Sequence, residues 1–158
     1  MKRSEWGTYA VWILATEAVG LAAGILIREG VALYNETAVK PPLSPPAAVF
    51  PIVWTVLYAL MGAGAARVSL RAEKGERGAA LQSFWVQLAF NFAWSILFFR
   101  LRAYGISVLC LAALWVLILR MISSFRAIDP AAARWNVPYL VWVTFAGYLN
   151  AGVWLLNR

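Results

Sequence analysis

Long apolar stretches separated by short charged segments dominate the pattern of this chain. A helix needs about 20 residues to cross the hydrocarbon core of a bilayer. The apolar stretches predict five such helices, at residues 6–27, 47–66, 79–99, 103–125 and 135–157. Membrane-spanning β-strands would alternate polar and apolar residues, and these stretches do not. The pattern therefore predicts an all-α integral membrane protein with a single domain, residues 1–158, built as a bundle of five transmembrane helices.

The segments between the stretches differ in length and proline content. Residues 28–46 form the longest loop and contain the run Lys40-Pro41-Pro42-Leu43-Ser44-Pro45-Pro46. Prolines stiffen a loop, so this one either caps the mouth of the bundle or is an ordered connector. Residues 67–78 predict a short charged hairpin.

The last stretch has its own proline signature. Asp129 followed by Pro130 is typical of a helix N-cap with proline at the first helical position. The pair predicts the start of the fifth span or of a short helix leading into it. Pro138 lies one turn inside the span and should bend it, because proline removes a backbone donor.

Composition supports the membrane assignment. Of the 158 residues, 63% are hydrophobic, whereas soluble domains are about half apolar. The 14 Lys and Arg residues, against 7 Asp and Glu, lie almost entirely between the apolar stretches. That distribution is typical of loops that contact anionic lipid head groups, and it argues against nucleic acid as a partner.

The basic residues divide unevenly between the two sides of the predicted bundle. The side of the N-terminus carries nine, namely Lys2, Arg3, Arg67, Arg71, Lys74, Arg77, Arg120, Arg126 and Arg134. The other side carries five, namely Arg28, Lys40, Arg100, Arg102 and Arg158. The positive-inside rule therefore predicts that the N-terminus lies inside.

The chain has no His and one Cys, Cys110. A disulfide framework, a Cys/His zinc site and haem ligation by His are therefore excluded within one chain. We expect no metal site and no required cofactor. Any bound porphyrin must be held by stacking and hydrogen bonds.

Three predicted helices carry candidate ligand-facing residues at helical spacing. They are Trp54, Tyr58 and Met61 in the second, Gln87, Asn91, Trp94, Ser95 and Phe98 in the third, and Trp142, Phe145, Ala146 and Leu149 in the fifth. Amides that face lipid stay unpaired at a cost of several kcal/mol, so the two in the third helix should face the interior. These faces either pack helices together or form an apolar pocket with polar anchors.

Glu17 is the only acidic residue deep within an apolar stretch. Carboxylates inside a membrane are candidates for functional sites. Glu17 either makes a local hydrogen bond or sits in a wet cleft, or it couples small-molecule export to protons. The nearby Gly20 and Gly24 form a small-xxx-small pattern, which permits close helix approach within one bundle or across a dimer.

Three motifs, in order along the chain, resemble the TspO/MBR family of tryptophan-rich sensory proteins, which includes the mitochondrial translocator protein. The first is residues 40–46 followed by Val49-Phe50-Pro51-Ile52-Val53-Trp54-Thr55-Val56-Leu57-Tyr58. The others are Gln87-Leu88-Ala89-Phe90-Asn91-Phe92-Ala93-Trp94-Ser95 and Pro138-Tyr139-Leu140-Val141-Trp142-Val143-Thr144-Phe145. The resemblance implies a five-helix bundle, commonly a homodimer, with a ligand pocket capped by the first loop.

The resemblance also implies which residues bind ligand. By position the family pocket would include Trp54, Asn91, Trp142, Tyr58, Ala146, Pro41, Pro42, Pro45 and Tyr34. Gln87, Trp94 and Phe145 join these candidates from the helix faces described above. Family members bind porphyrins such as protoporphyrin IX, and some bacterial members are described as degrading porphyrin with light and oxygen. The tryptophans implicated in that reaction match Trp54 and Trp142.

We therefore expect a membrane receptor or carrier for tetrapyrroles, with a role in porphyrin handling or stress sensing, rather than a conventional enzyme. The alternatives are a light- and oxygen-dependent porphyrin-degrading enzyme and a proton-coupled exporter that uses Glu17. Expected partners are porphyrin or another apolar small molecule, membrane lipid and a second copy of the chain. Animal members end in a cholesterol-recognition segment, but here no Lys or Arg follows Tyr148 until Arg158. A prokaryotic cell membrane fits better than a mitochondrion.

Overall fold

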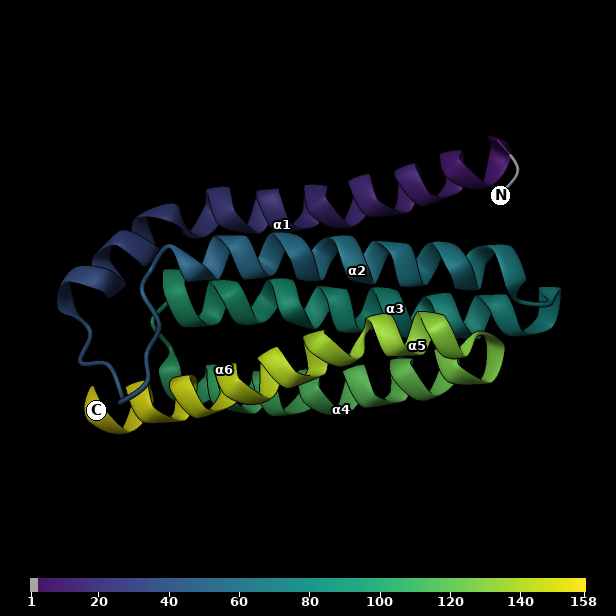
Figure 1. Ribbon diagram of the computed structural model, residues 1–158. Helices are drawn as coiled ribbons and strands as arrows, with labels where there is room; N and C mark the ends of the chain where they lie inside the picture. The colour runs from purple at the N-terminus through teal and green to yellow at the C-terminus, as the bar shows by residue number, and fades with distance from the viewer. Residues whose placement is uncertain (1–2) are drawn as a thin grey trace.

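The computed structural model describes residues 3–158, with side chains from Glu5 onward, and within that range it is helical without strands. The elements are α1 (Arg3–Thr37), α2 (Val49–Arg71), α3 (Lys74–Ser95), η1 (Ile96–Arg100), α4 (Tyr104–Ile128), α5 (Pro130–Trp135) and α6 (Val137–Leu156). The long helices lie side by side with nearly parallel axes (Figure 1). The prediction of an all-α bundle is confirmed. Lys2, counted above for topology, lies outside the described residues, as does the side chain of Arg3.

Four segments are long and apolar enough to cross a membrane: Glu5–Thr37, Val49–Arg71, Tyr104–Ile128 and Pro130–Leu156. Helix α3 completes the five-helix bundle and is the most polar of the long helices. Its amides, Gln87 and Asn91, are fully buried between its neighbours. Lipid offers no hydrogen-bond partners to backbone N–H and C=O groups, whereas a helix pairs these groups within itself. This explains why the bundle is built from helices.

Helix α1 is longer than predicted. We expected a helix at 6–27 and a loop at 28–46, but the helix continues to Thr37 and the loop covers only residues 38–48. Hydropathy marks where lipid contact ends, not where a helix ends, and residues 28–37 contain no proline to stop it. Gly30 allows this extension to approach η1, because a Cβ there would lie 2.2 Å from the Phe99 carbonyl oxygen.

Other predicted helices also end at different residues than expected, because the structure continues them into charged segments. The predicted hairpin at 67–78 is helical except for Ala72 and Glu73, so the second and third helices are longer than 47–66 and 79–99. Helix α4 extends to Ile128 rather than 125. The predicted fifth helix at 135–157 is the pair α5 and α6, broken at Asn136, so Pro138 lies in the first turn of α6 instead of bending it.

Small residues let α1 pack closely on α2. A Cβ on Gly62 would lie 2.7 Å from the Cα of Ile13, and one on Gly20 would lie 2.4 Å from the Tyr58 ring. The Thr16 hydroxyl donates to the Tyr58 carbonyl at 2.9 Å and ties the helices together. Gly20 thus mediates a contact within the bundle, whereas the Cβ position of Gly24 meets open space.

Asp129 fastens the opposite end of the bundle from the loop. As predicted, it caps α5, accepting hydrogen bonds from the amides of Ala131 (2.8 Å) and Ala132 (3.1 Å). Its carboxylate also pairs with Arg67 of α2 at 2.8 Å and contacts the guanidinium of Arg71. The Arg67 guanidinium lies 5.0 Å from the Trp135 ring. One carboxylate, 2% exposed, thus joins α2, α4 and α5.

Burial alone would raise the pKa of the Asp129 carboxyl, but hydrogen bonds from Arg67, Arg71 and the α5 amides outweigh it and hold the pKa below its ordinary 3.8. The stabilisation is therefore present above about pH 4 and is lost as the pH falls through the lowered folded-state pKa. We expect Asp129→Asn to lower the free energy of unfolding by about 1–3 kcal/mol at neutral pH. Thermal unfolding in detergent from pH 7 to pH 3 measures this. The difference between wild type and variant should shrink at the acid end, and a constant difference would contradict the ion-pair explanation.

Candidate functional site

A cavity of about 520 Å³ lies inside the bundle near the end that carries the first loop. Its wall is made by the second half of α1, the first half of α2, the junction of α3 with η1, and α6. The lining is mainly apolar with a few polar side chains, which is the usual composition of a small-molecule site.

Aromatic rings form one continuous surface on this wall. Trp54 lies 5.6 Å from Tyr58 and 6.2 Å from Trp94, measured between ring centroids. Trp94 in turn lies 5.8 Å from Phe98, which lies 5.4 Å from Tyr34. These tilted contacts hold each ring in place and leave an apolar face for a flat ligand.

A π-helical turn, η1, places two neighbouring aromatics on the cavity. The Leu101 amide donates to the Ile96 carbonyl at 2.9 Å, five residues back instead of four. Phe98 and Phe99 both belong to this turn, and both line the cavity. Such turns are frequent at functional sites.

A chain of buried hydrogen bonds supports the aromatic wall from behind. The Tyr58 hydroxyl donates to Asn91 Oδ1 at 2.7 Å, and Asn91 Nδ2 donates to the Tyr139 hydroxyl at 3.1 Å. Tyr139 donates to Gln87 Oε1 at 2.9 Å. Of these four hydrogen-bonded residues, only Tyr58 lines the cavity. Gln87 and Asn91 therefore face the interior as predicted, but they contact protein side chains and do not line the cavity.

The other polar side chains of α3 and α6 near the cavity are also paired. Asn150 Oδ1 accepts from Trp94 Nε1 and from the Ser107 hydroxyl, both at 3.0 Å. Ser95 donates to the Asn91 carbonyl at 3.2 Å. The indole of Trp94 is thereby fixed in orientation.

The proline-rich loop attaches to α6. Val39 and Asn157 exchange two hydrogen bonds, of 2.9 and 2.8 Å, and the Tyr148 hydroxyl donates to the Pro42 carbonyl at 2.8 Å. Pro41 packs on Gly152, where a Cβ would lie 2.6 Å from the proline Cβ. The predicted site residues Pro41, Pro42 and Pro45 lie on this loop and do not line the cavity, which the segment touches only at Ala47.

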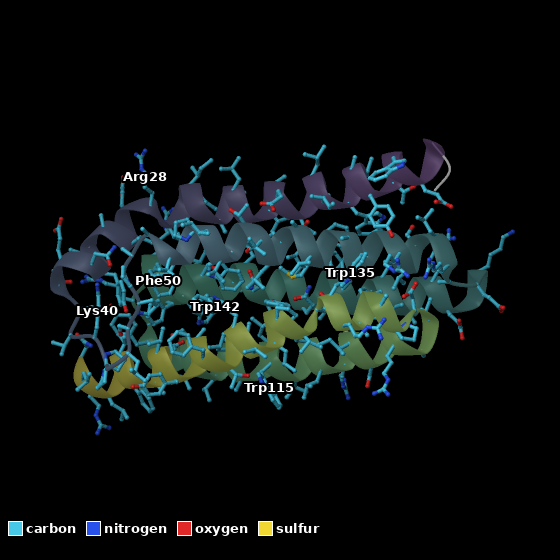
Figure 2. All side chains as sticks on the ribbon, in the orientation of Figure 1. Arg28, Lys40, Phe50, Trp115, Trp135 and Trp142 are labelled. Atoms are coloured by element: carbon cyan, nitrogen blue, oxygen red, sulfur yellow. The ribbon has the colours of Figure 1, made fainter. Side chains whose placement is uncertain are left out.

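The two remaining predicted residues of α6 lie beside the cavity without lining it. Phe50, which does line it, is 5.8 Å from Trp142, and Trp142 is 5.6 Å from Phe145. Phe50 and Trp142 occupy the same end of the bundle in Figure 2. The Trp142 indole nitrogen is buried without a hydrogen-bond partner.

The structure thus brings Tyr34, Trp54, Tyr58, Trp94 and Ala146 of the predicted set onto one cavity. Reasoning from the sequence missed Phe50, Phe99 and the α1 residues between Gly20 and Val31 as cavity-lining residues. Ser95, Phe98 and Leu149, which helical spacing had also pointed out, line the cavity as well, whereas Phe99 lay outside the predicted faces. Within the described residues, no group of three His, Cys, Asp or Glu side chains could hold a metal ion.

Helices long and apolar enough to cross a membrane, packed around an aromatic cavity, define a polytopic helical membrane protein. Comparison with known proteins supplies the family. The sequence pattern of the TspO/MBR family matches residues 12–155. The chain belongs to the TspO/MBR family, and this membership supports a role as a membrane receptor or sensor.

Relatives come from bacteria and animals. The chain is 37% identical over 150 residues to protein CrtK of Rhodobacter capsulatus, covering 94% of this chain and 92% of that protein. It is 34% identical over 151 residues to the tryptophan-rich protein TspO of Chlorobaculum tepidum, covering 95% and 96%. It is also 33% identical over 121 residues to the translocator protein of Bos taurus, covering 75% and 72%.

Replacing Asn91 tests the hydrogen-bond chain behind the wall. Asn91→Ala leaves the hydroxyls of Tyr58 and Tyr139 short of a partner in a dry interior, so the free energy of unfolding should fall by about 1–3 kcal/mol. Thermal or denaturant unfolding in detergent measures the change. Gln82→Ala, at an exposed position on the same helix, should change stability by no more than about 0.5 kcal/mol. If the two substitutions lowered stability equally, the buried hydrogen bonds of Asn91 would not be what stabilises the aromatic wall.

A glycine pair on α6 tests how the loop is held. Gly152→Ala forces Pro41 away, so the Val39 amide should exchange with solvent deuterium severalfold faster. Gly147→Ala is the matched control, because its Cβ would lie 3.8 Å from the nearest atom, an ordinary contact. Both changes gain the same helix propensity. Unchanged exchange in Gly152→Ala would show that the loop is not anchored through Pro41.

Proposed function

We propose that this protein is a membrane receptor or carrier that holds a tetrapyrrole such as protoporphyrin IX, or a related apolar ligand, in the cavity between α1, α2, η1 and α6. The supporting observation is the aromatic wall from Trp54 to Tyr34 on a cavity of about 520 Å³. A flat, largely apolar macrocycle matches such a wall, because stacking on aromatic rings needs no directional partner. Family membership agrees with a receptor or sensor role.

Binding would place the ligand at the loop end of the bundle. We propose an N-terminus on the inside of a prokaryotic cell membrane, following the positive-inside rule, so the cavity opens toward the outer side. A homodimer is part of the same proposal. Exposed apolar residues along α1, such as Val11, Leu14 and Ile25, face either lipid or a second copy.

A second candidate is photochemical degradation of bound porphyrin, favoured by one observation. Trp54 lines the cavity, so an indole lies where it could donate an electron to an excited macrocycle. The other implicated tryptophan, Trp142, lies behind Phe50. The export alternative rests on Glu17, which also lines the cavity. Porphyrin flux into vesicles that is unchanged in Glu17→Gln would exclude that alternative.

The test blocks the cavity from two sides. Ala146→Phe fills it from α6, and Gly24→Leu fills it from α1, where the added side chain meets open space. Titration of protoporphyrin IX in the dark, followed by tryptophan quenching, should show affinity reduced about tenfold or more in both variants. Ala112→Phe, exposed on α4, is the matched control and should bind like wild type.

Equal affinity in all four proteins, or equal quenching of N-acetyltryptophanamide dissolved in detergent micelles, would overturn the cavity as the porphyrin site. Illumination of the same samples in air separates receptor from enzyme. Loss of the porphyrin absorption band with wild type, but not with the blocked variants, would favour degradation. A stable band favours the receptor.

A further inference from the structure

One carboxylate on the cavity has no partner. Glu17 lines the cavity from α1 and is half-buried, and no described residue gives it a hydrogen bond or an ion pair. In contrast, Tyr58, Ser95 and Asn150 on the same cavity are all paired. An unpaired, ionised carboxylate in a membrane-spanning helix is costly unless something in the cavity compensates its charge.

The rings near Glu17 provide the other half of a binding site. Glu17 is one turn from Gly20, whose Cβ position lies 2.4 Å from the Tyr58 ring, and Glu17 and Tyr58 both line the cavity. Tyr58 continues into the wall formed with Trp54 and Trp94. A carboxylate beside aromatic faces is the arrangement that attracts an organic cation, through charge pairing and cation–π attraction.

The one basic residue on the cavity lies away from Glu17. Arg28 is three turns further along α1, about 16 Å by helix rise. It is exposed, and its side chain extends away from the bundle in Figure 2. The positive charge therefore sits at the rim, while the negative charge lies deeper along α1.

We propose that the cavity also binds apolar organic cations, with Glu17 pairing the protonated amine and Trp54, Tyr58 and Trp94 contacting its apolar body. This ligand class is distinct from the porphyrins proposed above. It uses the same cavity but does not require that porphyrin be a ligand. Glu17 is then the residue that determines selectivity for charge.

The test compares a naphthyl-bearing tertiary amine with its neutral isostere, in which CH replaces the amine nitrogen. Equilibrium binding of both radiolabelled probes is measured on protein in nanodiscs of zwitterionic lipid, with empty nanodiscs subtracted. Wild type should prefer the amine by about tenfold or more. Glu17→Gln should bind both probes equally, with the affinity of wild type for the isostere.

Two variants complete the design. Glu17→Asp keeps the charge and should keep the preference for the amine. Glu29→Gln removes an exposed carboxylate of α1 that does not line the cavity, and should behave as wild type. Three results would each overturn the proposal. Wild type could bind both probes equally, Glu17→Gln could keep the preference for the amine, or Glu17→Gln could lose affinity for both probes to the same extent. If the protein did not bind porphyrin but still preferred the amine, the porphyrin function proposed above would be wrong and the proposal for organic cations would stand.

Discussion

Hydrocarbon offers no hydrogen-bonding partner, and this constraint governs the arrangement of the bundle. Most buried polar side chains on the inner faces of the helices are therefore paired with one another, as in the hydrogen-bonded series Tyr58–Asn91–Tyr139–Gln87. It joins α2, α3 and α6 at one level and fixes the ring of Tyr58. Tyr58 is both the end of this hydrogen-bonded series and part of the aromatic wall. The position of the wall therefore depends on Asn91, Tyr139 and Gln87, which do not line the cavity.

The same constraint explains what the sequence could reveal. The length of the apolar stretches predicted the helices, because a helix must be long and apolar enough to cross the lipid. The amides of Gln87 and Asn91 were expected to face inward, because lipid cannot pair with them. The N-cap at Asp129 was readable because it depends on two adjacent residues. Helix ends were not readable in the same way, since residues 28–37 and 67–71 are helical for reasons of backbone and packing that hydropathy does not report.

The site was predicted in part. Family motifs and helical spacing pointed to Trp54, Tyr58, Trp94 and Ala146, which share the cavity. They could not tell that Asn91 and Trp142 lie behind its lining residues, because spacing gives the face of a helix but not which neighbour fills the space before it. Much of the α1 wall was missed because Gly20, Ala23 and Gly24 have no side chain typical of a ligand site, and because Arg28 and Val31 lie in a part of α1 that was predicted as loop.

The attachment of the proline-rich loop has a consequence for the order of assembly. The partners of Val39 and Pro42 are Asn157 and Tyr148, more than a hundred residues later in the chain. A chain made from its N-terminus inserts α1 and α2 long before α6 exists. The loop therefore waits unanchored through most of synthesis, and the loop end of the bundle is completed only when the last helix arrives.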